Sequence, residues 1–256
     1  MIHTKKGGAA LWLLAAVILV AAGGGYYYYF IKKSESPPAA KSEETQAMGG
    51  FEFATPKKSA HYENNTPLHG AILAGMPLNI VVDVNFDLAK PSSISVMNGG
   101  KEYGAGETMI DANKLAMRRK MEQNAPDGLY SVSYNACWPD GSCHDGNFQF
   151  AIDREASAKY EDMRGKEEIT IRLSEVKFTP MNIRVSKNTK IMWINDDTVT
   201  HYVNTNPHPQ HTYYPPQNSP ALQKGDGFMR TFREAGIYNY HCSAHADSMK
   251  GSILVE

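Results

Sequence analysis

The sequence predicts an all-β protein with two β-sandwich domains behind an N-terminal transmembrane helix. Three observations support this prediction. An uncharged, apolar run lies between Lys6 and Lys32. Short segments in which apolar and polar residues alternate, separated by Gly, Asn and Pro, recur through much of the remaining chain, which is typical of a sandwich of short strands. No amphipathic helix of useful length interrupts these segments between residues 60 and 153.

The composition is that of an ordinary globular protein. The chain has 256 residues, of which 42% are hydrophobic, and a formal net charge of -1. Binding to nucleic acid phosphates usually requires an excess of basic residues, so we do not expect nucleic acid as a partner. The three cysteines are too few for a disulfide scaffold.

The N-terminal region predicts a membrane anchor. After a short tail (1–8), residues 9–31 are apolar and numerous enough to cross a hydrocarbon core of about 30 Å. The aromatic run Tyr26–Phe30 suits a membrane–water interface. A cleaved signal peptide is the alternative, because Val20-Ala21-Ala22 has the small residues of a cleavage site. We expect a single-pass protein of the cell membrane whose domains face the periplasm or the cell exterior.

Four further regions follow the anchor. Residues 32–59 are rich in Ser, Glu, Pro, Ala and Lys, which predicts a flexible linker. The alternating segments predict one sandwich at 60–154 and a second at 167–256, and the charged, Ala-rich residues 155–166 predict a hinge between them. The clearest strands are predicted at 78–86, 93–96, 115–118, 129–134, 147–152 and 168–173.

A soft metal site is predicted near the end of the chain. Cys242, His245 and Met249 follow one another as C-x2-H-x3-M, so all three can reach one ion from a single loop. A second imidazole is needed, and His201 follows an apolar strand and the turn Asn195-Asp196-Asp197. Two His, one Cys and a weak axial Met form the ligand set of blue-copper centres. The alternatives are a zinc site, for which Met is a poor ligand, and a buried structural thiol beside a core methionine.

This region resembles the plastocyanin and azurin superfamily, the cupredoxins. The resemblance covers roughly residues 167–256 and includes the strand before Cys242, the closing strand after Met249 and the ligand order His, Cys, His, Met. It implies a Greek-key sandwich that holds one type 1 copper through His201, Cys242, His245 and Met249. It also implies that His245 is the surface port for electrons. The loop is one residue shorter than the x4 spacing common in plastocyanin-like members.

The first sandwich resembles the copper-resistance protein C (CopC) family. The resemblance is carried by the segments His61–Ala71 and Pro139–Phe148. It implies an immunoglobulin-like sandwich with a second copper, Cu(II), and the matching ligand positions are His61, Asp140 and His144. The alternatives are that these histidines are solvated loop residues, or that Cys and His side chains of the late loop bind zinc.

Two cysteines and three histidines are further candidates for structural or metal-binding roles. Cys137 and Cys143 flank a segment that contains Pro139 and Gly141, so a turn can bring them together in a disulfide. One disulfide and one metal thiolate suit an oxidising compartment. His208 and His211 lie in a Pro-rich stretch. They are interpreted either as ligands for another ion or as residues of a surface loop. His241 should point away from the Cys242 thiol, because side chains alternate along a strand, and is interpreted as structural.

Two classes of function follow from these residues. The first is a membrane-tethered electron carrier that meets a redox partner protein. The second is a copper-handling protein for binding, resistance or delivery, which passes copper to an acceptor. An enzyme of the multicopper oxidase type is not expected, because the sequence lacks the clustered His-x-His pairs of a trinuclear site.

Overall fold

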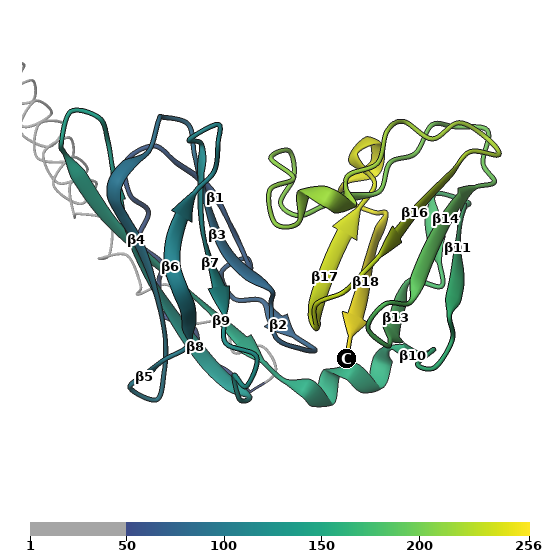
Figure 1. Cartoon of the computed structure of the whole chain (residues 1–256), viewed down its shortest axis with the longest axis horizontal. Coiled ribbons are helices and arrows are strands. Elements are labelled where there is room, and N and C mark those ends of the chain that lie inside the picture. The colour runs from purple at the N-terminus through teal and green to yellow at the C-terminus, as the bar shows by residue number, and fades with distance from the viewer. Residues whose placement is uncertain (1–49) are drawn as a thin grey trace, which may run out of the picture. The chain divides into compact units, whose positions relative to one another are not determined.

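The computed structural model describes residues 50–256 (Figure 1). These residues are mostly β-strand and form four sheets, with three short 3-10 helices among them. The prediction of an all-β architecture is therefore confirmed for this part of the chain. The predicted tail (1–8), the membrane segment (9–31) and most of the linker (32–59) lie outside the described residues.

The first two sheets contain the strands from β1 to β9. One has the order β1 (Tyr62–Thr66), β3 (Asn79–Val84), β7 (Ala116–Met121), β6 (Gly104–Ile110). The other has the order β2 (Ile72–Leu73), β9 (Cys143–Ile152), β8 (Gly128–Cys137), β4 (Ala89–Asn98), β5 (Lys101–Glu102). Most neighbours in these sheets pair antiparallel, and β2 with β9 is the parallel exception among them.

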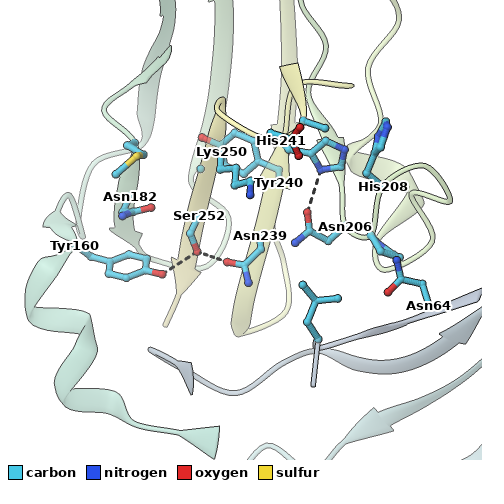
Figure 2. Close-up of a pocket in the computed structure, with 16 residues that line it drawn as sticks. Asn64, Tyr160, Asn182, Asn206, His208, Asn239, Tyr240, His241, Lys250 and Ser252 are labelled. Carbon is cyan, nitrogen blue, oxygen red and sulfur yellow. Dashed lines mark hydrogen bonds between the residues drawn. The ribbon is translucent and has the colours of Figure 1, made fainter. Parts of the chain in front are cut away.

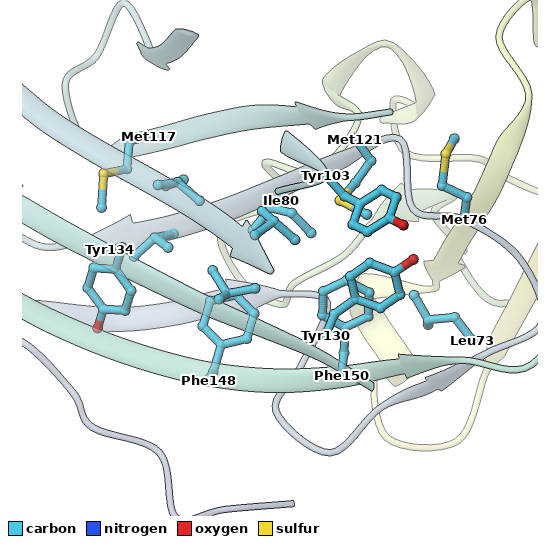
Figure 3. Packing of buried hydrophobic residues seen from close by; sticks show 14 of the residues in the cluster. Leu73, Met76, Ile80, Tyr103, Met117, Met121, Tyr130, Tyr134, Phe148 and Phe150 are labelled. Carbon is cyan, nitrogen blue, oxygen red and sulfur yellow. The ribbon is translucent and has the colours of Figure 1, made fainter. Parts of the chain in front are cut away.

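The alternation along β8 shows why these strands form a sandwich. Tyr130, Val132 and Tyr134 are buried, whereas the intervening Ser131 and Ser133 are exposed, as expected when successive side chains point to opposite faces. The buried side chains of both sheets meet in one apolar core, shown in Figure 3. Members of this core from the two sheets include Ile80, Val82 and Met117 on one side and Tyr130, Val132, Phe148 and Phe150 on the other.

The second pair of sheets contains the strands from β10 to β18. One has the order β10 (Glu161–Asp162), β13 (Asn182–Val185), β18 (Lys250–Val255), β17 (Gly236–His241), β15 (Asn204–Thr205). The other has the order β12 (Lys177–Thr179), β11 (Glu168–Ser174), β14 (Lys190–Asn195), β16 (Gly227–Thr231). Parallel pairs (β11 with β14, β13 with β18) and antiparallel pairs (β14 with β16, β17 with β18) are mixed in both sheets.

The core of this second sandwich is built around aromatic side chains. Trp193 is fully buried, and its ring lies edge-on to Tyr240 with 5.6 Å between ring centroids. Phe178 meets the same Tyr240 ring at 4.7 Å. Edge-to-face pairs of this kind stabilise a core beyond the area that they bury. They also fix β17, the strand that leads directly into the predicted metal loop.

Strand β3 contributes to both cores. Ile80 and Val82 belong to the core of the first sandwich, whereas Val81 packs in the second cluster and every residue of the strand is buried. The hydroxyl of Tyr213 accepts the N–H of Leu78 and donates to the carbonyl of Ile237, both at 2.7 Å. The loop that carries Tyr213 is thus tied to β17 and to the residue that precedes β3.

The helical segments are 3-10 helices of one or two turns. They are η1 (Arg154–Lys159), η2 (Pro215–Gln217) and η3 (Ser243–His245). The first falls in the predicted hinge, where Asp153 caps it by accepting the N–H of Glu155. Within residues 50–256, no helix has the length and apolar character that a bilayer crossing needs.

Candidate metal centre

The loop after β17 places three of the predicted ligands on one closed turn. The N–H of Cys242 donates to the carbonyl of Met249 at 3.0 Å. The N–H groups of His245 and Met249 donate to the carbonyls of Cys242 and His245, each at 2.9 Å. Because these bonds join the two ends of the loop to its middle, the spacing C-x2-H-x3-M gives a compact structure around the short helix η3.

His201 reaches the same place from a distant part of the chain. Its backbone forms a two-way bridge with Leu222, with N–O distances of 3.1 and 2.9 Å. Asn195, fully buried at the end of β14, donates its side-chain amide to the carbonyls of Val199 and Leu222. The turn after β14 is therefore closed by one amide side chain, and this turn delivers His201 to the loop of Cys242.

The three side chains converge at the Cys242 sulfur. Its Sγ lies 3.5 Å from Nδ1 of His201 and 3.5 Å from Nδ1 of His245, and the two rings are 5.1 Å apart. Cys242 and His201 are fully buried, His245 is half-buried, and Met249 is buried in the same apolar cluster. The structure thus brings the predicted Cys and both His together, with Met249 on the same loop.

Asp197 orients the His201 ring. Its Oδ2 lies 2.8 Å from Nε2 of His201, and its carboxylate also accepts the N–H groups of Glu175 and Val176. The hydrogen bond from Val176, followed by the one from His201, lowers the pKa of this carboxyl. An ionised Asp197 holds a proton on Nε2 of His201, which leaves the lone pair of Nδ1 facing Cys242.

These residues fit a copper ion held by nitrogen and sulfur. The Cys242 sulfur also accepts the N–H of Tyr202 at 3.3 Å. A thiolate and two imidazoles in a buried pocket, with a thioether on the same loop, match the soft and borderline donors that copper takes. Sequence reasoning named the four candidate ligands but gave Asn195 and Asp197 no individual role, although both stand in the turn that it identified.

Replacing Asp197 with Ala is expected to weaken copper binding by about 10- to 100-fold, the usual cost of removing a carboxylate that orients a metal-bound histidine. The His201 ring would lose both its orientation and its fixed proton. Competition with a Cu(I) chelator measures the affinity. Asp196→Ala is a matched control, since the Asp196 carboxylate pairs with Arg172 on the surface. Equal affinities of the two variants would contradict the role of Asp197.

The predicted ligands of the first sandwich do not form a comparable cluster. The described residues contain two groups of three or more His, Cys, Asp or Glu whose ligand atoms lie within 4.8 Å of one another, and neither group includes His61, Asp140 or His144. The His61 ring stacks on Phe86 and meets Trp138 edge-on, while its Nδ1 lies 3.0 Å from Oδ1 of Asn85. A copper site at these three positions stays a prediction.

The loop between β8 and β9 carries the other two of these residues. A disulfide joins Cys137 and Cys143 at its base. Asp140 is exposed and accepts hydrogen bonds from the hydroxyl and the N–H of Ser142, which lower the pKa of its carboxyl. His144 is exposed at the start of β9. The carboxylate of Asp140 is therefore directed to its own turn.

A second histidine cluster lies beside the Cys242 loop. His208, His211 and His241 form the other group of converging ligand atoms. Burial, followed by the positive charges of His211 and His208, lowers the pKa of His241 to about 4, so this imidazole is neutral near pH 7. His208 and His241 also line a cavity of about 650 Å³, shown in Figure 2. The sequence named all three histidines, but it did not show that they meet.

Fold and site together define a class: β-sandwich proteins with a buried site of one Cys and two His for a transition metal. Comparison with known families makes this class specific. Residues 166–256 match the copper binding proteins of the plastocyanin/azurin family, and residues 62–153 match the CopC domain. The prediction of a cupredoxin domain preceded by a CopC-like domain is confirmed. Both families bind copper, which confirms the predicted cofactor.

Individual relatives match about a third of the chain. Amicyanin of Paracoccus denitrificans is 27% identical over 93 residues, which are 34% of this chain and 65% of amicyanin. A purple cupredoxin from Nitrosopumilus maritimus is 28% identical, with a TM-score of 0.30, over 34% of this chain and 98% of that protein. A Cu(I) structure of an amicyanin variant is 25% identical, with a TM-score of 0.31, over 35% of this chain and 83% of that one.

Proposed function

We propose that this chain is a membrane-anchored, extracytoplasmic copper protein that transfers electrons through a type 1 copper centre at His201, Cys242, His245 and Met249. The observation that carries the proposal is the buried Cys242 sulfur, which lies 3.5 Å from Nδ1 of both His201 and His245. It acts as a carrier and not as an enzyme. The described site contains a ligand set for one redox-active ion.

Each residue has a distinct part in this function. Bound copper supplies one-electron redox chemistry. Cys242 provides the covalent path for the electron, and its sulfur accepts the N–H of Tyr202. Asn195 and Asp197 hold His201 in one orientation. A site that its own hydrogen bonds hold in place reorganises little when the oxidation state of the ion changes, which favours rapid electron transfer.

His245 is the proposed port for electrons. It is half-buried, whereas His201 and Cys242 are fully buried, so it is the imidazole of the site that a partner surface can approach. A protein that docks over His245 would approach the ring whose Nδ1 lies 3.5 Å from the Cys242 sulfur. We therefore propose a redox partner protein that binds at the end of the sandwich where η3 lies.

The proposed location rests on the sequence. Residues 9–31 have the length and apolar character of an anchor, and the linker 32–59 would let the folded part reach its partners. The Cys137–Cys143 disulfide suits an oxidising compartment, outside the cytoplasm. We accordingly place a CopC-like domain at 60–154, a hinge at 155–166 and a cupredoxin domain at 167–256 on the periplasmic or outer side.

The CopC match favours a second candidate function, copper binding, resistance or delivery. In that case His61, Asp140 and His144 would hold a second copper, and the protein would release metal to an acceptor. The two functions differ in what leaves the protein. A carrier gives up an electron and keeps its copper, whereas a delivery protein gives up the ion.

Redox cycling of the copper-loaded full chain in detergent distinguishes the two. A carrier is expected to lose its visible absorption on reduction with ascorbate and regain it on oxidation with ferricyanide, over many cycles. Its copper content, measured by atomic absorption after gel filtration, should stay constant. Loss of copper to a chelator of moderate affinity with each reduction would contradict electron transfer and support delivery.

A further inference from the structure

Three imidazoles meet on the side of β17 that faces away from the Cys242 sulfur. The ring centroids of His208, His211 and His241 are 5.1 to 5.4 Å apart. Each ring offers one nitrogen, and these three nitrogens lie within 4.8 Å of one another. Three ligand atoms at this separation can converge on one ion with small movements of the rings, since metal–nitrogen bonds are about 2 Å long.

Asn206 determines which ring nitrogen of His241 carries the proton. Its Nδ1 lies 3.0 Å from Oδ1 of Asn206, a contact drawn in Figure 2. Because the amide oxygen only accepts, His241 donates the proton of Nδ1, and its Nε2 carries an unprotonated lone pair. This Nε2 points to Nε2 of His211 at 3.2 Å. A carbonyl oxygen that fixes the tautomer of a histidine in this way is the usual support of a metal ligand.

The loop with the other two histidines is held in place at several points. The N–H of His211 donates to the carbonyl of Pro207 at 2.7 Å, and the side-chain amide of Asn218 donates to the carbonyl of His211 at 3.0 Å. The next residue, Thr212, donates its hydroxyl to Asp83 at 2.7 Å. The backbone of the cluster is thus ordered by its own hydrogen bonds, which reduces the entropy that an ion must overcome on binding.

The surroundings leave room for an ion to enter. His208 is exposed, His211 half-buried and His241 buried, so the cluster runs from solvent to interior. His208 and His241 line the same cavity. The hydroxyl of Ser243 lies 3.0 Å from Nε2 of His211, where it can orient a water in a fourth position. The nearest strand neighbour with a charge is Lys250, which pairs with His241 in the sheet and is itself exposed.

We propose that His208, His211 and His241 bind one Cu(II) ion, separate from the copper at Cys242. Imidazole nitrogen suits copper, zinc and nickel, and among divalent ions of the first transition row Cu(II) binds such donors most strongly. No thiolate takes part, so this site lacks the intense visible band of a copper–cysteine centre. His241 and Cys242 are consecutive residues, so the two ions would be joined through a single peptide bond.

The test uses the full chain in detergent and the metal alone. In the variant Cys242→Ser/His144→Ala, which lacks the thiolate and an imidazole of the predicted site in the first sandwich, one Cu(II) is expected to bind per chain. Its electron paramagnetic resonance spectrum should show splitting from three nitrogens. Adding His208→Ala and His211→Ala should weaken this binding at least 100-fold and remove the nitrogen splitting. Both substituted side chains lie on a surface loop, so folding should persist.

Two further measurements make the proposal refutable. Asn206→Leu removes the acceptor of His241 and is expected to weaken Cu(II) binding by about 10-fold, at the low end for such supporting groups. His69→Ala, an imidazole of the first sandwich, should leave the affinity unchanged. The proposal is overturned if copper stoichiometry and spectrum survive the loss of His208 and His211, or if Zn(II) occupies the site and equimolar Cu(II) does not displace it. Neither result would affect the proposal for Cys242, which is absent from the tested background.

Discussion

Replacing Cys242 with Ser is expected to abolish the visible absorption of the copper-loaded protein. The band arises from charge transfer between a thiolate and Cu(II), and Cys242 is the free cysteine among the described residues. Its sulfur lies 3.5 Å from Nδ1 of both His201 and His245. A serine hydroxyl remains protonated near neutral pH and is a poor ligand for copper, so affinity at this site should fall by several orders of magnitude.

The experiment is a Cu(II) titration of the full chain in detergent, followed by absorption between 400 and 800 nm. Met249→Leu is the matched control, because it keeps the volume of a buried side chain on the same loop and removes only the sulfur. This control should retain the band, with a changed reduction potential, since the axial ligand tunes the copper potential. A wild-type protein that binds copper without colour would contradict the type 1 assignment and favour copper storage or delivery.

Sequence reasoning could locate this centre because its chemistry is local. Cys242, His245 and Met249 stand on one loop of C-x2-H-x3-M, and the strands beside them show a clear period of two. Ile169, Ile171 and Leu173 are buried while Glu168 and Arg172 are exposed, as the alternation predicts. Ligand spacing on one loop and alternation along one strand both depend on residues that are close in the sequence. They can therefore be recognised from the sequence alone.

Contacts between distant segments could not be predicted in this way. Alternation indicates that His241 points away from the Cys242 sulfur, but it does not indicate what lies on that side. The ring meets His211, a residue 30 positions earlier that is brought there by a Pro-rich loop. The hydroxyl of Tyr213 likewise reaches the N–H of Leu78 across 135 positions. Loop paths decide both contacts, and no periodic signal describes a loop path.

The burial of Asp83 is a third long-range effect, and it predicts a large dependence of stability on pH. This residue of β3 is 1% exposed, and its Oδ2 has no hydrogen-bond partner among the described residues. Burial raises the pKa of its carboxyl to about 7, although the hydrogen bond from Thr212 and the charge of Arg118 act in the opposite direction. The folded state therefore prefers the protonated acid.

The direction of this pH dependence follows from the difference between the pKa of Asp83 in the folded and in the unfolded chain. The carboxyl of Asp83 has an ordinary pKa in the unfolded chain, so its stabilising contribution is complete below about pH 4 and is lost as pH rises through 7. We expect Asp83→Asn to unfold like the wild type near pH 4 and to be more stable at pH 8. A shift of about three pKa units corresponds to roughly 4 kcal/mol as an upper bound, since one unit is about 1.4 kcal/mol.

Urea denaturation of the metal-free protein between pH 4 and 8, followed by far-ultraviolet circular dichroism, measures this difference. Asn can keep the hydrogen bond that Thr212 donates to Oδ1 at 2.7 Å, so the comparison isolates the charge. Asp87→Asn is the control, because that carboxylate is exposed in the same sandwich and pairs loosely with Lys114. A stability difference between Asp83→Asn and wild type that stays constant over this pH range would show that Asp83 is ionised in the folded protein. In that case the contact with the loop of Thr212 would be a charged one, held by Arg118.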